Sequence, residues 1–437
     1  MKRGMRRELA FACCLAVGLF VGDVAKGAPN EGQENVAQEA QATLHQLRAE
    51  ATRQLPRSAA TVDKVRLTWP LIPGAVRYRV ELLSSSEYKK ENIIYAETVS
   101  MAGTEIKLEA LHGVPFELAY WSVCGLRFDG SPLGDFSAPK PLSFGERHPV
   151  SPLLLSDYAE MAEMPIYLVY AWVPVQGTSS YEVEVWREEV GKRERVRHYY
   201  TYEWTLYDEK PLRTPGKYSW RVRALDGNGR RWSDWSEPET FSVKTPVSVA
   251  ALGDSITHGG GAIMTQPSRT MYCWESYAGL PVKNLGKSGD STSDLLYRFE
   301  NDVLPFAPKY LVIMGGVNDF RAGAPASVTI QNLSCLAEKC RAYGITPIFA
   351  TATPISPRLM EHVWDIEPAA GGWKAAQRAI NEWIMTQPYA VDVSTPLTDE
   401  NGELKASLTT DGLHPDAEAK RIIGERIGKY LKEKFGL

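Results

Sequence analysis

From residue 246 onward, the chain alternates between short apolar runs and longer amphipathic stretches. The apolar runs predict strands at residues 247–252, 281–286, 310–316, 346–352 and 389–394. Apolar residues at helical spacing predict helices that begin near residues 255, 292, 326, 373 and 417. Continuous apolar strands that alternate with amphipathic helices indicate a parallel sheet covered on both faces. We therefore predict a three-layer α/β/α domain with a five-stranded parallel sheet over residues 246–437.

The preceding region shows the two-residue alternation of β-strands and an internal repeat. The segment "LTWPLIPGAVRYRVELL" from Leu67 is similar to "YAWVPVQGTSSYEVEVW" from Tyr170, with a Trp and a Tyr at matching positions. Turn residues such as those in "DGNG" separate the strands. Several short strands in units of about 100 residues indicate β-sandwiches. Both units resemble fibronectin type III modules, and we place two all-β domains at residues 61–146 and 147–245.

The first 60 residues have the pattern of a leader followed by a spacer. Basic residues at the start precede an apolar run of about 13 residues, which is short for a membrane span. We predict a signal peptide at residues 1–27, a linker or helical spacer at residues 28–60, and no transmembrane segment after cleavage. A retained membrane anchor and a coiled coil stay open as alternatives for these two segments. The protein is expected to be secreted, periplasmic or associated with the cell envelope.

Composition narrows the classes of function. Hydrophobic residues make up 44% of the 437 residues and charged residues 23%, which is typical of globular proteins. The net charge of −4 and the lack of a long basic stripe argue against nucleic-acid binding. The four cysteines beyond the predicted leader are too few for a disulfide scaffold, and no Cys/His cluster has the spacing of a metal site. We expect neither a metal nor a cofactor.

Residues with useful chemistry follow the predicted strands at their carboxyl ends. Ser255, Gly286 and Asn318 come after the first three strands, and Asp411 and His414 lie in the loop before the last helix. Ligands of open parallel sheets bind at this edge. We therefore expect these five residues to lie close together.

These residue types suit acyl transfer. A serine hydroxyl needs a neighbouring base to remove its proton, and His414 is the candidate base for Ser255. Asp411, three residues earlier, would orient the imidazole. The oxyanion that develops needs hydrogen-bond donors held in place beforehand. We predict that the backbone N–H groups of Ser255 and Gly286 and the side-chain amide of Asn318 supply them.

Four short motifs carry a resemblance to a known family. The motifs are "GDSIT", "NLGKSGD", "GGVND" and "DGLHP", and they contain Ser255, Gly286, Asn318 and the pair Asp411 and His414. In this order they resemble the four sequence blocks of the SGNH, or GDSL-type, hydrolases, over residues 247–437. The resemblance implies a flavodoxin-like fold and hydrolysis of esters without a cofactor, often of acetyl esters of carbohydrates. It also implies catalytic roles for these five residues.

Structural roles are expected for residues in and near the motifs. Ser255 is expected to be the N-cap of the helix that follows, as well as the nucleophile. Asp319 is expected to be structural, because an oxyanion needs a donor rather than another negative charge. His258 is expected to pack beside the site, and Gly259–Gly261 to turn the chain at the rim of the pocket. The long loop before Trp373 either forms a wall of the pocket or only covers the domain.

The sequence thus predicts a secreted serine esterase that acts on an acetylated polysaccharide or another small acyl ester. The two β-sandwiches are candidates for contact with glycan or the cell surface. Two alternatives stay open. One is a lipid-directed esterase or lysophospholipase, and the other is a glycan-binding or surface-binding protein in which the hydrolase domain is secondary.

Overall fold

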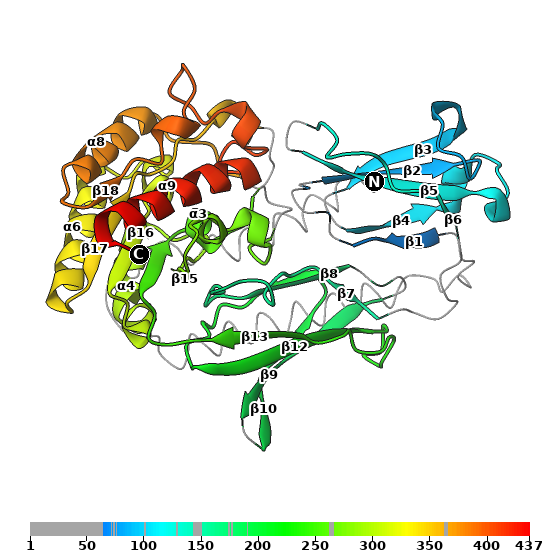
Figure 1. Ribbon diagram of the computed structural model, residues 1–437, viewed down its shortest axis with the longest axis horizontal. Helices are drawn as coiled ribbons and strands as arrows, with labels where there is room; N and C mark the ends of the chain where they lie inside the picture. Colours follow the sequence, from blue (N-terminus) through cyan, green and yellow to red (C-terminus); the bar gives the residue numbers. More distant parts are fainter. Residues whose placement is uncertain are drawn as a thin grey trace, which may run out of the picture. The chain divides into compact units, whose positions relative to one another are not determined.

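The computed structural model describes residues 64–437, apart from residues 71, 73–74, 76, 100–101, 128–129, 143–150, 174, 176–177, 190, 262–265 and 362–365. Strands β1 to β6 lie within residues 64–141, β7 to β13 within residues 153–243, and the remaining elements within residues 249–435 (Figure 1). The predicted signal peptide and spacer lie outside the described residues. Among the helices that are described, none has the length and apolar character needed to cross a membrane.

The first β-domain consists of two antiparallel sheets. Its strands are β1 (Lys64–Thr68), β2 (Arg77–Leu83), β3 (Ile93–Val99), β4 (Gly103–Lys107), β5 (Tyr120–Leu126) and β6 (Lys140–Pro141). One sheet pairs β1 with β4, and the other has the order β3-β2-β5-β6. Short 3-10 helices lie at Lys90–Asn92, Leu108–Leu111 and Phe116–Leu118. Alternate residues of β2, namely Tyr78, Val80 and Leu82, are buried in the core of this domain.

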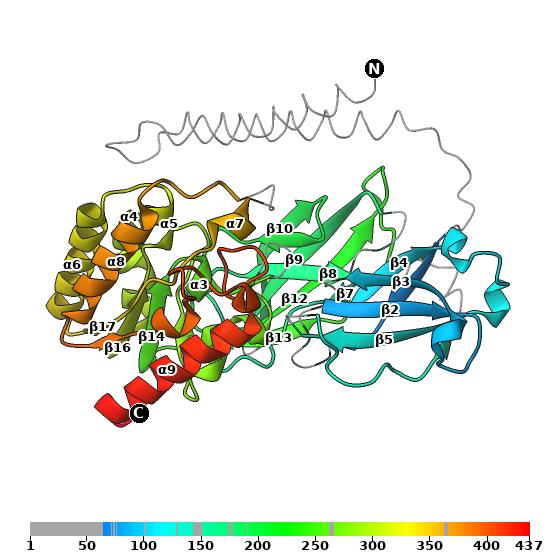
Figure 2. The ribbon, with the colours of Figure 1, turned by 90° about the horizontal axis from the view of Figure 1, so that it is seen from above.

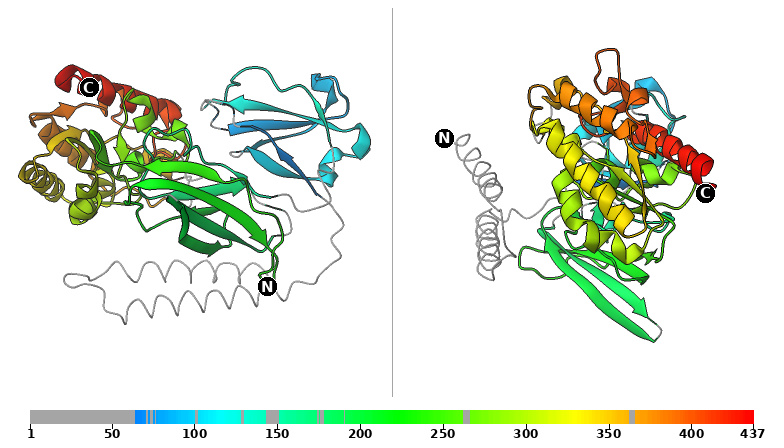
Figure 3. Two further views of the ribbon diagram at one scale, coloured as in Figure 1. Left: turned by 60° about the horizontal axis from the view of Figure 1, so that its bottom comes forward. Right: turned by 90° about the vertical axis from the view of Figure 1, so that its left-hand side faces the viewer.

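The second β-domain repeats the two-sheet arrangement. Its strands are β7 (Leu153–Leu154), β8 (Val169–Val173), β9 (Ser180–Glu189), β10 (Lys192–Thr201), β11 (Thr205–Tyr207), β12 (Gly216–Leu225) and β13 (Glu239–Val243). The larger sheet has the order β10-β9-β12-β13, and the smaller one has the order β11-β8-β7. Figure 3 shows the strands of this domain in shades of green. The prediction of two all-β sandwiches is therefore confirmed.

The internal repeat seen in the sequence recurs as a repeated packing motif. In the first domain the rings of Trp69 and Tyr78 contact each other with their centroids 5.5 Å apart. In the second domain the matching residues, Trp172 and Tyr181, are in ring contact at 5.0 Å. The two positions match because each repeat uses this aromatic pair to fill the space between its sheets.

The C-terminal domain contains the predicted five-stranded parallel sheet. Its strands are β14 (Val249–Gly253), β15 (Lys283–Asn284), β16 (Tyr310–Met314), β17 (Thr346–Ala350) and β18 (Ala390–Val391). Their order is β15-β14-β16-β17-β18, and every neighbouring pair is parallel. The second strand thus lies at the edge and the first lies inside, which is the order of flavodoxin-like sheets. This confirms the predicted fold class.

Helices cover both faces of this sheet. They are α3 (Ser255–His258), α4 (Thr292–Asp302), α5 (Val317–Arg321), α6 (Ala326–Ala342), α7 (Pro357–Met360), α8 (Trp373–Met385) and α9 (Ala417–Phe435). Short 3-10 helices lie at Thr270–Tyr272, Trp274–Tyr277, Leu304–Phe306, Thr395–Leu397 and Ala406–Leu408. Helix α6 packs between α4 and α8, whereas α9 packs against the segment from Thr270 to Tyr277 on the other face (Figure 2).

The helix that follows β14 is shorter than the other helices predicted from the sequence. Helix α3 has a single turn and ends at Gly259, whose φ of 112° does not continue a helix. Gly260 also has a positive φ, of 89°. The chain therefore turns away directly after α3, as the run of glycines predicted, and returns to the sheet only at β15.

Candidate active site

Three of the predicted residues form a continuous series of hydrogen bonds at the carboxyl edge of the sheet. The Oγ of Ser255 lies 3.1 Å from Nε2 of His414. The other ring nitrogen of His414, Nδ1, lies 2.7 Å from Oδ2 of Asp411. Ser255 begins α3 and is separated from the end of β14 by the N-cap Asp254, whereas the other two residues lie in the loop before α9. The structure thus brings together residues that are 159 positions apart in the chain.

The environment of Asp411 favours its ionised form. Its side chain is buried, and burial alone would raise the pKa of the carboxyl group. The charge of His414 and hydrogen bonds from the His414 ring and from the backbone N–H groups of Leu413 and His414 outweigh burial and lower this pKa below its usual value. The two backbone N–H groups donate to Oδ1 at 2.9 and 2.8 Å. One carboxylate oxygen therefore holds the loop, and the other holds the imidazole.

Ser255 is presented by a tight turn between strand and helix. The prediction that Ser255 is the N-cap is wrong by one residue. Asp254 is the N-cap, because its side chain accepts a hydrogen bond from the N–H of Ile256 at 2.9 Å. Ser255 is the first residue of α3, so its hydroxyl does not cap the helix and stays available to His414. Buried Lys420 of α9 donates to the carbonyl oxygen of Ile256 and holds the same turn from below.

A cavity of about 550 Å³ opens over Ser255 and His414. Asn318 and Gly289 also line it. The Nδ2 of Asn318 donates to the carbonyl oxygen of Asp290 at 2.9 Å, which leaves its second hydrogen for the cavity. No hydrogen bond among the described residues uses the backbone N–H of Gly289. Loop residues on the far side include Ile366 and Glu367, so the described part of the long loop before α8 does form a wall.

Gly286, by contrast, does not line the cavity. Its N–H donates to Oδ1 of Asn284 at 2.9 Å, and the residue is buried. The amide nitrogen of Asn284 in turn donates to the carbonyl oxygen of Thr257 at 2.6 Å, which ties the loop to α3. The structure thus contradicts the prediction that the Gly286 N–H faces the site, because a neighbouring side chain already occupies this donor. Gly289, three residues later with a φ of 89°, reaches the cavity instead.

Gly286 is expected to be needed for packing. A Cβ added there would lie 2.1 Å from the backbone nitrogen of His258. We expect Gly286→Ala to lower the free energy of unfolding by about 1–3 kcal/mol, the usual cost of overpacking a core. Chemical denaturation checks this, with Gly371→Ala as the control, since nothing lies within 4 Å of a Cβ at Gly371. A Gly286→Ala variant as stable as the control would contradict the close packing.

Asp319 and His258 have the structural roles expected for them. The buried carboxylate of Asp319 accepts hydrogen bonds from the N–H and the hydroxyl of Thr292 at 2.9 and 2.5 Å and so stabilises the start of α4. The buried ring of His258 lies 2.8 Å from Oγ of Ser288 and 2.7 Å from the carbonyl oxygen of Tyr167. Burial lowers the pKa of His258 to about 4, so the ring is neutral at neutral pH.

One cluster in the described part of the chain has the residue types of a metal site. It consists of Glu182, Glu184 and His198 on the larger sheet of the second β-domain. Arg223 donates to Glu182 at 2.6 Å, and Arg221 donates to Glu184 at 2.8 Å. Because arginines already neutralise both carboxylates, this cluster is better described as a network of ion pairs. Cys124, Cys273, Cys335 and Cys340 are all free.

Two parts of the chain match known families. Residues 251–422 match the GDSL-like Lipase/Acylhydrolase family, and residues 173–245 match the Rha78A-like N-terminal immunoglobulin domain. The second β-domain is therefore immunoglobulin-like, which is a sandwich of the same general architecture as fibronectin type III. We refer to it below as the Ig-like domain.

Individual relatives were also found. The chain is 33% identical over 119 residues to the uncharacterized lipoprotein YqeF of Bacillus subtilis (strain 168), which covers 24% of this chain and 49% of that protein. The chain thus spans about half the length of this relative.

Matches to solved structures were found as well. A putative lipolytic protein of the G-D-S-L family from Desulfitobacterium hafniense is 24% identical, with 43% of this chain and 100% of that chain covered and a TM-score of 0.35. The acetylxylan esterase Axe2 from Geobacillus stearothermophilus is 19% identical, with 45% and 96% covered and a TM-score of 0.33. On the family match over residues 251–422 and the fold of this region, the C-terminal domain of the chain belongs to the GDSL-like lipase/acylhydrolase family.

Proposed function

We propose that this protein is a serine esterase that hydrolyses acyl esters. The observation that carries the proposal is the series of hydrogen bonds from Ser255 through His414 to Asp411, because Ser255 and His414 also line a cavity. A nucleophile, a base within hydrogen-bond reach and a third group that orients the base are the parts that acyl transfer requires.

In the first half of the reaction, Oγ of Ser255 attacks the carbonyl carbon of the ester, and its proton passes to Nε2 of His414. The carbonyl oxygen becomes an oxyanion. The N–H groups of Ser255 and Gly289 and the amide of Asn318 are its proposed donors, each worth about 3 kcal/mol of barrier in such sites. The tetrahedral intermediate then expels the alcohol, which takes the proton from His414, and the acyl group stays on Ser255.

In the second half, a water molecule gives a proton to His414 and attacks the acyl carbon. A second oxyanion forms and collapses, and the carboxylic acid leaves as Oγ of Ser255 takes the proton back. Asp411 stays ionised throughout, because its environment lowers its pKa. Its carboxylate holds Nδ1–H and stabilises the imidazolium that forms in each half.

The rate is expected to depend on pH through His414. A protonated His414 cannot accept the proton of Ser255, so kcat/KM should fall on the acid side. The ionised Asp411 should not contribute to this decrease, because the pKa of its carboxyl group is lowered from the usual value. The measurement is the pH profile of p-nitrophenyl acetate hydrolysis, and a flat acid side would argue against His414 as the base.

As the natural substrate we propose an acetylated carbohydrate at the cell envelope. The N-terminal pattern of a secretory leader, the two β-sandwiches and polar groups in the cavity, such as Ser288 and Glu367, support this assignment. The matched Bacillus protein is named a lipoprotein, which also fits an envelope location.

A panel of substrates tests the proposed function. Wild-type protein should release acetate from at least one of a set of acetylated xylans, pectins, mannans and peptidoglycan, and should hydrolyse p-nitrophenyl acetate. A stoichiometric organophosphorus inhibitor should stop both reactions and label the peptide that contains Ser255. Preference for long-chain or phospholipid esters would favour a lipid-directed enzyme, and the lack of any turnover would argue against the esterase assignment.

A further inference from the structure

The Ig-like domain is joined to the hydrolase domain at the edge strand β15. The N–H of Ile166 donates to the carbonyl oxygen of Asn284 at 3.1 Å, and the fully buried Lys283 donates to the carbonyl oxygen of Met164 at 3.0 Å. An edge strand otherwise presents unpaired backbone groups. The segment that precedes β8 therefore covers the edge of the parallel sheet.

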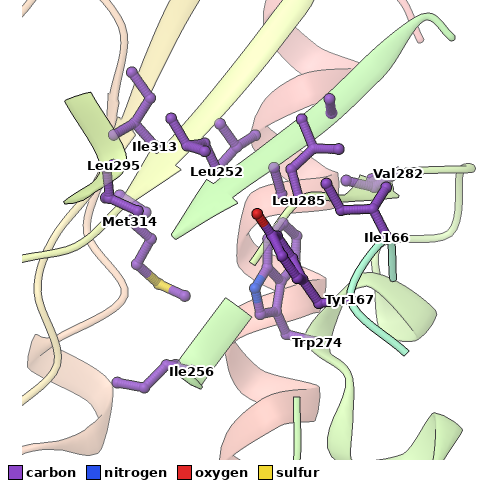
Figure 4. Close-up of a cluster of buried hydrophobic side chains, with 14 of the residues drawn as sticks. Ile166, Tyr167, Leu252, Ile256, Trp274, Val282, Leu285, Leu295, Ile313 and Met314 are labelled. Atoms are coloured by element: carbon purple, nitrogen blue, oxygen red, sulfur yellow. The ribbon is translucent and has the colours of Figure 1, made fainter. Parts of the chain in front are cut away.

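Apolar side chains continue this contact into the core. Figure 4 shows Ile166 and Tyr167 beside Val282, Leu285 and Trp274 of the hydrolase domain. Ile166 is fully buried, and all five residues belong to one buried cluster. Apolar burial of this kind makes the contact resemble the interior of a single domain rather than a loose contact between modules.

Polar contacts also link the Ig-like domain to the loop that contains Gly289. Neutral His258 donates from Nε2 to the carbonyl oxygen of Tyr167, so its Nδ1 is an acceptor for the N–H and the hydroxyl of Ser288. In the same loop, Lys287 forms an ion pair with Glu209 of the Ig-like domain at 2.9 Å. The residues that flank Gly289 are thus fixed partly by another domain.

A second network reaches the site from the other side of Tyr167. Its hydroxyl donates to Asp302 at 2.7 Å, and Arg213 of the Ig-like domain also donates to Asp302. Asp302 accepts in turn from buried Arg298, which donates to Asp290 and, at 2.9 Å, to the carbonyl oxygen of Gly253. Gly253 precedes the turn that presents Ser255, so Asp302 and Arg298 link the Ig-like domain to the backbone of this turn.

One side chain of the Ig-like domain reaches the cavity itself. Tyr207, at the end of β11, lines the cavity together with Ser255, Ser288 and Gly289. Its ring packs edge-on against His258, with the centroids 6.4 Å apart. The side chain is 44% exposed, and protein atoms around its hydroxyl raise its pKa to about 12, so it is a neutral tyrosine.

We propose that the Ig-like domain completes the active site and that Tyr207 is a specificity-determining wall, which limits the size of the group accepted next to Ser255. The proposal rests on the proposed esterase function. It assigns to the Ig-like domain a role in substrate choice at the catalytic centre.

Ratios of rates test this assignment. The first ratio compares kcat/KM for p-nitrophenyl octanoate with that for p-nitrophenyl acetate, and the second compares 1-naphthyl acetate with ethyl acetate. We expect Tyr207→Ala to raise at least one of them more than threefold, because the shortened side chain opens the wall. Tyr207→Phe keeps the ring and should change neither ratio by more than threefold. The first ratio reports on the acyl side of the site, and the second on the alcohol side.

Tyr200→Ala is the matched control. Tyr200 lies on β10 of the same domain, is 60% exposed and does not line the cavity, so its removal should leave both ratios unchanged. General destabilisation by Tyr207→Ala would lower all rates together and leave the ratios as they are. Ratios within threefold of wild type for Tyr207→Ala would overturn this inference alone, whereas a wild-type protein without any ester turnover would overturn it together with the proposed function.

Discussion

Ser255→Ala is expected to abolish ester hydrolysis. The substitution removes the oxygen that lies 3.1 Å from Nε2 of His414 and leaves the rest of the turn in place. Removing the nucleophile from a serine hydrolase lowers kcat by about 10⁴- to 10⁶-fold, and the residual rate comes from the donors and the bound substrate. Steady-state hydrolysis of p-nitrophenyl acetate measures this loss directly.

The substitution should lower the catalytic rate without lowering the stability of the protein. Ser255 does not cap α3, because Asp254 does, so the thermal midpoint of Ser255→Ala should stay close to that of wild type. Ser293→Ala is the matched control, since Ser293 is exposed on α4 and should keep full activity. If Ser255→Ala retained more than a tenth of the wild-type kcat, another group would have to be the nucleophile.

Asp411→Asn is expected to lower kcat by about 10³- to 10⁴-fold, through the tautomer of His414. Two backbone N–H groups point at Oδ1 of Asp411, so the amide oxygen of an asparagine would take that position. Its NH₂ group would then face Nδ1 of His414, which must become an acceptor. The imidazole proton would move to Nε2, and Nε2 could no longer accept the proton of Ser255.

The experiment is a comparison of kcat and thermal midpoint between Asp411→Asn and Asp399→Asn. Asp399 also accepts two backbone N–H bonds within its own loop, from Asn401 and Glu403, but it has no histidine partner. Loss of loop geometry alone would therefore affect both variants alike. A kcat for Asp411→Asn within tenfold of wild type would contradict the role of Asp411 in orienting His414.

The sequence by itself was enough to predict the elements of the α/β domain and three residues, Ser255, His414 and Asp411, that hydrogen bonds join in the structure. Continuous apolar runs such as the one at Tyr310–Met314 can only be buried on both faces, so periodicity was enough to predict a parallel sheet. The carboxyl ends of parallel strands meet at one edge, so chain order alone predicts that Ser255, Asn318, Asp411 and His414 lie close together.

Tertiary structure alone decided which donors face the cavity. Gly286 and Gly289 belong to one short loop. In the structure the N–H of Gly286 donates to Asn284, whereas Gly289 lines the cavity, and no local pattern in the sequence shows this difference. The N-cap of α3 is Asp254 and not the expected Ser255. Aspartate and serine are both common N-caps, so the geometry of the turn decides between them. The only sign in the sequence that Gly289 lines the cavity is its place as a second glycine in the motif "NLGKSGD", directly before Asp290.

The place of the Ig-like domain also depends on contacts between distant segments. Tyr167 and Tyr207 lie in or beside strands whose sequence predicts only a sandwich, yet one packs into the hydrolase core and the other lines its cavity. Periodicity reports which face of a strand is buried, but not which domain buries it. The closeness of Ser255, His414 and Asp411 could be predicted because it follows from chain order at one sheet edge, whereas the walls of the cavity depend on how separate segments pack.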